Sequence, residues 1–271
     1  MIVLDGGEGW HLVMQPDHGD FAGRLAAAWG NDEFEPLRSR DSMVVAAARH
    51  DDGWAVRERW SEVDEDDEDG RPISFFDIDV LSHIAFYSAG ITDVTIHDPY
   101  AGFMDAMHGA GLYRGRYGVH PELPLLPDAE DHRQAVDRFL SDLEDSYPER
   151  RAQLGIDENE QWTNYKLLQV FDRTALYFCG FPKLADGDEF SLGFVPTGYD
   201  GTETEIRFTA LEPFAPLAPR HVRIDPYPFA GSPAVFALER RLIPKRRRTS
   251  EEFRSELLQT PTETVEIVTE R

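Results

Sequence analysis

The stretch Leu168-Gln169-Val170-Phe171-Asp172-Arg173-Thr174-Ala175-Leu176-Tyr177-Phe178-Cys179 carries the clearest fold signal in this chain of 271 residues. Its apolar side chains recur three or four positions apart, which is typical of the buried face of an α-helix, and we expect a helix over residues 160–179. Asp172 lies in the middle of that apolar stripe. A buried carboxylate without a partner costs about several kcal/mol, so Asp172 should be protonated, paired or bound to a metal.

Two earlier segments repeat this combination of an apolar stripe and a polar group. A helix expected over residues 18–29 begins its stripe with His18, and a second expected over 41–54 places the adjacent His50 and Asp51 on its buried rows. Imidazole and carboxylate groups on three inward helical faces suit a divalent metal ion. Two alternatives stay open, because His18 is also compatible with a core histidine and Asp172 with an ion pair to Arg173.

The remainder of the chain divides at about residue 185. Before it, helical patterns are expected at 77–89, 99–110, 128–146 and 148–154, and two strands at 1–4 and 10–15. After it, short β-type runs appear at 190–195, 203–210, 221–224, 234–241 and 264–268. We therefore predict a helical metal-binding domain with an N-terminal hairpin over 1–185 and a strand-rich segment over 186–271 packed on it. The fold class is mainly α, and α+β overall. Because an isolated hairpin is marginal in water, the hairpin should join the C-terminal strands in one antiparallel sheet.

The charge balance narrows the classes of partner. The chain has 51 acidic and 27 basic residues, a net charge of −24, and only three lysines. This pattern favours a halophilic protein, with an ordinary acidic protein as the alternative, and it disfavours nucleic acid as a partner. The single cysteine, Cys179, and the lack of a signal peptide or apolar span predict a cytoplasmic protein without a membrane partner.

The order of the polar residues resembles a known superfamily. His18, then His50-Asp51, then Asp172 within Val-Phe-Asp-Arg-Thr-Ala-Leu, is similar to the HD-domain superfamily of metal-dependent phosphohydrolases over roughly residues 15–180. Several longer phrases also resemble an uncharacterised domain-of-unknown-function family along nearly the whole chain. They are Gln15-Pro16-Asp17-His18, Trp29-Gly30-Asn31, His50-Asp51-Asp52-Gly53-Trp54, Asp98-Pro99-Tyr100-Ala101-Gly102 and Pro226-Tyr227-Pro228-Phe229.

The superfamily resemblance implies a ligand set. His18, His50, Asp51 and Asp172 would bind one or two divalent ions (Fe, Mn, Mg, Zn or Ni), with Asp51 bridging if there are two. His83 and His108 fall in the interval where dinuclear members supply extra histidines, so we expect catalytic roles for them beside Asp51, with ordinary core histidines as the alternative.

The expected activity is hydrolysis of a phosphate ester or phosphoanhydride of a small molecule, such as a nucleotide. Arg49 and Arg173 flank the ligands in sequence and are candidates for contact with phosphate, and Trp54 and Tyr100 are candidates to line the substrate pocket. Two other functions fit the same residues: a di-iron oxygenase, and a ligand-binding or regulatory module without turnover. The oligomeric state is not predicted.

Overall fold

The computed structural model describes residues 1–119, 130–180, 189–212 and 220–271. Helices account for most of the first two-thirds of the chain: α1 (Gln15–Ala28), α2 (Arg40–Arg49), α3 (Trp54–Glu58), α4 (Val80–His97), α5 (Pro99–Tyr113), α6 (Arg133–Glu144), α7 (Tyr147–Leu154) and α8 (Glu158–Phe178). One more helix, α9 (Ser250–Gln259), lies near the C-terminus. No described helix is long and apolar enough to cross a lipid bilayer.

The described strands form one sheet of seven strands in the order β1-β2-β6-β7-β5-β4-β3. They are β1 (Ile2–Asp5), β2 (Gly9–Val13), β3 (Glu189–Pro196), β4 (Glu203–Ala210), β5 (His221–Asp225), β6 (Ala234–Pro244) and β7 (Glu263–Glu270). The predicted pairing of the N-terminal hairpin with a C-terminal strand is confirmed, since Trp10 of β2 is opposite Ile243 of β6. The sheet is not wholly antiparallel as predicted, because β5 and β7 run parallel, as the intervening β6 and α9 allow.

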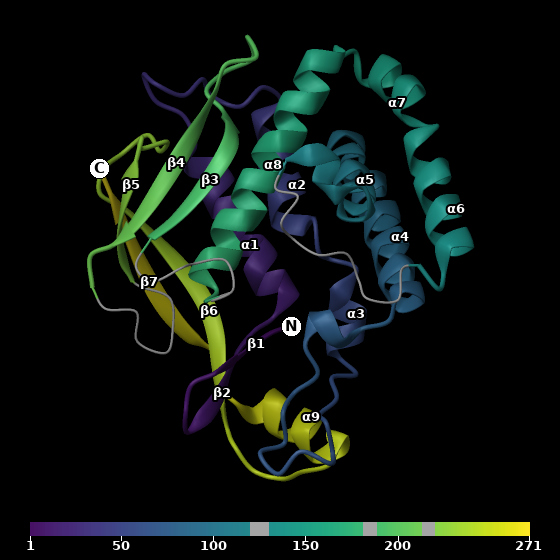
Figure 1. The fold of residues 1–271 in the computed structure, drawn as a ribbon, viewed down its shortest axis with the longest axis vertical. Helices are drawn as coiled ribbons and strands as arrows, with labels where there is room; N and C mark the ends of the chain where they lie inside the picture. The colour runs from purple at the N-terminus through teal and green to yellow at the C-terminus, as the bar shows by residue number, and fades with distance from the viewer. Residues whose placement is uncertain (120–129, 181–188, 213–219) are drawn as a thin grey trace.

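Helices α1 and α8 lie between this sheet and the remaining helices of the first two-thirds (Figure 1). Their apolar faces meet the sheet through aromatic side chains: the ring centroid of Phe21 on α1 lies 6.2 Å from that of Phe236 on β6, and that of Phe178 on α8 lies 6.3 Å from that of Phe208 on β4. Large aromatic side chains contribute much of the apolar surface that a core buries. The chain is therefore α+β, with a central helical layer that is covered on both sides.

The helix predicted over 41–54 is confirmed only as far as Arg49, where α2 ends, because α3 begins only at Trp54. Between them the backbone makes a tight turn, in which the amide of Asp52 donates to the carbonyl of Arg49 (2.9 Å) and that of Trp54 to Asp51 (3.0 Å). Gly53 permits this turn to touch α4: a Cβ atom at position 53 would lie 1.9 Å from the carbonyl oxygen of Phe86. His50 and Asp51 therefore come from a turn and not from a helical face.

Helix α9 is a second difference, because only strands are predicted after residue 185. Its start has a capping box, in which Thr249 accepts from the amide of Glu252 and Glu252 accepts from that of Thr249. Phe253 and Leu257 bury this helix against Trp10 and Leu12 of β2. The predicted division at residue 185 and the first two residues of the helix expected over 128–146 lie outside the described residues.

Candidate metal centre

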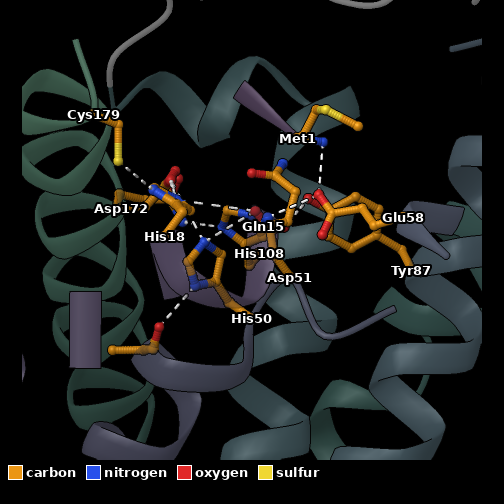
Figure 2. Close-up of polar contacts among 12 residues, drawn as sticks. Met1, Gln15, His18, His50, Asp51, Glu58, Tyr87, His108, Asp172 and Cys179 are labelled. Carbon is orange, nitrogen blue, oxygen red and sulfur yellow. Dashed lines mark hydrogen bonds and ion pairs between the residues drawn. The ribbon is translucent and has the colours of Figure 1, made fainter. Parts of the chain in front are cut away.

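Four separate segments deliver side chains to one buried point in the central helical layer. His18 comes from α1, His50 and Asp51 from the α2–α3 turn, His108 from α5 and Asp172 from α8. Figure 2 shows their imidazole and carboxylate groups pointing toward one another. All five are buried, with at most 5% of each residue exposed.

The distances between nitrogen and oxygen atoms define the centre. His18 Nε2 lies 3.1 Å from Asp172 Oδ1 and 4.0 Å from Asp51 Oδ2. His50 Nε2 lies 3.5 Å from Asp51 Oδ2 and 3.6 Å from Asp172 Oδ1. Ligand atoms of His18, His50 and Asp51 all lie within 4.8 Å of one another, and so do those of His50, His108 and Asp172. This buried group can hold a metal ion.

Each carboxylate divides its two oxygens between the centre and a protein donor. The hydroxyl of Tyr87 donates to Asp51 Oδ1 (2.6 Å), and Arg116 Nη1 donates to Asp172 Oδ2 (2.9 Å). The other oxygen of each, Asp51 Oδ2 and Asp172 Oδ1, is the one that faces the histidines. Such hydrogen bonds from outside the ligand set hold ligating groups in orientation.

His50 is oriented in the same way. Its Nδ1 lies 2.8 Å from the carbonyl oxygen of Ala47, which can only accept, so Nδ1 carries the proton. The other ring nitrogen, Nε2, is buried without a hydrogen-bond partner and faces the two carboxylates. A lone pair turned toward carboxylate oxygens is unfavourable unless a cation or a proton lies between them. The donor set therefore fits a divalent ion bound by nitrogen and oxygen.

The pKa shifts follow from this concentration of charge. Burial opposes ionisation of Asp172, but Arg116, His18 and His50 outweigh it and hold the pKa of that carboxyl well below its usual value. Burial likewise opposes a charge on His50, yet Asp51 and Asp172 raise the pKa of His50 to about 10. Burial and the neighbouring His50 lower the pKa of His108 to about 3, so His108 is neutral. The charges of His50 and His18 likewise outweigh burial and lower the pKa of Asp51, so both carboxylates are ionised at neutral pH, and a bound metal ion would take the place of the proton on His50 Nε2.

Of the two additional histidines, the structure brings only His108 into this group. His108 Nδ1 lies 3.1 Å from Gln169 Nε2, and the side-chain oxygen of Gln169 accepts from Arg116. His83 Nδ1 instead lies 2.7 Å from the hydroxyl of Tyr113. The ring of Tyr87 packs on His83, and the hydroxyl of Tyr87 donates to Asp51. The side chain of Tyr87 therefore lies between His83 and the centre.

The four residues expected to contact the substrate lie at separate places around the centre. Arg49 is half-buried and bonds Asp52 and Asp93, and the guanidinium of Arg173 is buried 5.9 Å from the ring centroid of Phe190 of β3. Trp54 is buried beside His83 and Tyr87. The hydroxyl of Tyr100 bonds Glu160 (3.2 Å), which precedes Asp172 by twelve residues on α8, or about 18 Å along the helix axis.

Sequence reasoning missed Tyr87, Gln169 and Arg116. Tyr87 and Gln169 lie on helices, and the residues that they contact, Asp51 and His108, are far from them in sequence. Arg116 belongs to the segment Gly115–Gly118, where all four residues have positive φ, including +50° for Arg116 itself. Non-glycine residues rarely adopt such φ values, and strain of this kind clusters at functional sites. The two glycines were a signal for an unusual turn, but nothing in the sequence indicated that Arg116 reaches Asp172.

A comparison with protein families gives one finding. A family model described as "Protein of unknown function (DUF3891)" matches residues 1–245. No curated protein and no solved structure matches the chain. The matched range contains all five residues of the buried centre.

Proposed function

This chain belongs to the DUF3891 family, and we propose that it is a metal-dependent phosphohydrolase that acts on a phosphate ester or phosphoanhydride of a small molecule. The observation that carries the proposal is the pairing of a buried histidine–carboxylate centre with an arginine bound to one of its carboxylates, Arg116 on Asp172 at 2.9 Å. The resemblance of the ligand order to the HD-domain superfamily supports the same reaction class.

His18, His50, Asp51 and Asp172 would hold the ion, and His108 would complete the group. When bound, a divalent ion supplies an activated water and a Lewis-acid contact to a phosphoryl oxygen. Tyr87 keeps Asp51 Oδ2 turned toward the histidines, because its hydroxyl occupies Oδ1. This arrangement keeps two carboxylate oxygens available at one point.

Arg116 would bind the phosphoryl group. Its described hydrogen bonds both run through Nη1, to Gln169 and Asp172, which leaves Nε and Nη2 for a substrate oxygen. A guanidinium group matches the geometry of phosphate oxygens and keeps its charge at all physiological pH values. Arg116 is the one described arginine that hydrogen-bonds a residue of the centre, so we assign to it the phosphate contact for which Arg49 and Arg173 are the sequence candidates.

The test combines metal analysis with a matched pair of variants. Native-purified protein should contain a divalent metal, and after reloading with Fe, Mn, Zn, Ni or Mg it should hydrolyse members of a panel of phosphate esters and nucleotides. Asp51→Asn should lose the ion and the hydrolysis while its helical circular dichroism persists. Asp52→Asn is the control, because the adjacent Asp52 pairs with Arg49 at the surface and lies outside the metal group.

Two results would contradict the proposal. Full metal content and activity in Asp51→Asn would show that the ligand assignment is wrong. Iron-loaded protein that consumes oxygen with an organic substrate, and hydrolyses no phosphate compound, would instead identify an oxygenase built on the same ligands.

A further inference from the structure

A small cavity, lined mostly by apolar side chains together with one histidine and two arginines, lies where the C-terminal end of α8 meets the sheet. It has a volume of about 20 Å³, and its lining includes His11, Arg220, Arg240, Cys179, Leu238 and Ile267. No acidic side chain is among its lining residues. In a chain with a net charge of −24, a cavity lined by two arginines and no carboxylate is unexpected and requires an explanation.

His11 lines this cavity and has one unsatisfied ring nitrogen. The residue is 8% exposed, and its Nδ1 is buried without a hydrogen-bond partner. Its ring is held against the turn between β1 and β2, since a Cβ atom at Gly6 would lie 2.3 Å from His11 Nε2. Burial and the nearby charge of Arg240 lower the pKa of His11, so the imidazole is neutral and carries one N–H.

The arginines leave one positive charge without compensation. Arg240 Nε is buried, and it lies 3.5 Å from Glu263 Oε2 without forming a hydrogen bond. Arg220 is exposed at the cavity mouth, close enough for its charge to lower the pKa of Arg240 in addition to the larger effect of burial. Among the described residues, the guanidinium of Arg240 has Glu263 as its one acidic neighbour and that of Arg220 has none within ion-pair distance, so a single negative charge would balance the two.

We propose that this cavity binds one monovalent inorganic anion about the size of chloride, held by His11 Nδ1 and Arg240 Nε, with Arg220 at the mouth. A volume of this size accepts a particle about as large as a water molecule and excludes a larger organic ligand. The site is distinct from the metal centre. Cys179 lies between the two, lining the cavity while its Sγ is 3.7 Å from His18 Nδ1.

The experiment is ³⁵Cl NMR line broadening of sodium chloride by the full-length protein, measured with and without a chelator. Chelation removes any ion from the metal centre, so broadening that survives it reports another chloride site. Bromide should displace the bound chloride and remove the excess line width. Arg240→Gln should weaken chloride binding by about tenfold, the loss expected for one hydrogen bond to a charged group.

Two further variants keep this test decisive. Arg207→Gln is the control for loss of charge alone, because Arg207 lies exposed on β4 beside Glu205, and it should bind chloride as the wild type does. Arg220→Gln removes an exposed charge at the cavity mouth without disturbing the core, so it replaces Arg240→Gln if that variant fails to fold. Unchanged broadening in both cavity variants, its loss on chelation, or displacement by phosphate but not by bromide would each overturn the assignment.

Discussion

At the scale of single residues, the centre depends on which atom of each side chain is already occupied. Ala47 holds the proton of His50 on Nδ1, and Tyr87 holds one oxygen of Asp51. What remains free, His50 Nε2 and Asp51 Oδ2, faces inward at a separation of 3.5 Å. The two groups are therefore oriented before any ion arrives, which reduces the entropy lost when an ion binds.

A substitution at Arg116 should affect substrate binding without weakening metal binding. We expect Arg116→Gln to lower kcat/KM for a phosphate substrate by about 10- to 100-fold, because a charged hydrogen bond to the phosphoryl group is lost. Metal affinity should stay constant or increase, since a positive charge near the bound cation is removed. Isothermal titration with the metal and steady-state kinetics measure the two effects separately.

The matched control is Arg114→Gln, two residues before Arg116 in the chain, which breaks an exposed ion pair between Arg114 and Glu144. It should leave both measurements unchanged. If Arg116→Gln weakened metal binding and activity in parallel, Arg116 would serve only to position Asp172.

The sequence predicted a candidate residue best where burial of a charged group was enough to require a partner. Asp172 in an apolar stripe had to have a partner, and it has His18 and Arg116. His83 and His108 were equivalent in the sequence, since each shares a helical row with apolar residues. Only the packing of α4 against α5 determines that His108 faces the carboxylates while His83 faces Tyr113.

At the scale of elements, the α2–α3 turn links the fold to the centre. The helical periodicity of residues 41–54 was real for α2, but a periodic pattern does not reveal where a turn of i to i+3 hydrogen bonds interrupts it. The contact between Gly53 and the backbone of Phe86 on α4 is of long range in sequence, so local propensity could not predict it. The turn was missed for that reason, although its two polar residues were identified.

We expect Gly53→Ala to destabilise the protein by about 1–3 kcal/mol, because the added methyl group overlaps the Phe86 carbonyl and one backbone must shift. The shift displaces His50 and Asp51, so metal affinity should fall as well. Thermal unfolding and metal titration measure these changes. Gly231→Ala is the control, as a Cβ atom there meets nothing within 4 Å, and equal stability of the two variants would contradict the role assigned to the turn.

At the scale of the whole molecule, one short basic run pairs with acidic residues of the N-terminal hairpin, of the loop that follows α3 and of α9. Lys245 lies 2.8 Å from Asp5 and 3.5 Å from Asp69, and both Arg246 and Arg248 pair with Glu256 of α9. The basic run at 245–248 thus has acidic partners within the protein.

Most of the acidic surface has no such compensation, so stability should depend on salt. The melting temperature should rise between 0.1 M and 1 M sodium chloride, because the screening length falls from about 10 Å to about 3 Å. Sodium gluconate should produce most of the same rise, which separates general screening from chloride binding at the Arg240 cavity. A melting temperature that does not change over this range would show that the net charge of −24 has little effect on stability.

The last prediction concerns whether the first 185 residues can fold alone. Strand β2 pairs with β1 on one side and with β6 on the other, and β6 comes from the C-terminal third. A fragment of residues 1–185 would lose β6 and expose the β2 edge, together with the apolar surface of Trp10 and Leu12 that β6 and α9 cover. We expect this fragment to be insoluble or to unfold without cooperativity, and to recover solubility when residues 186–271 are co-expressed. Circular dichroism melts and metal titration provide the comparison with the full chain. A soluble fragment that unfolds cooperatively and binds metal would show instead that the helical domain is self-sufficient and that the sheet is an appendage to it.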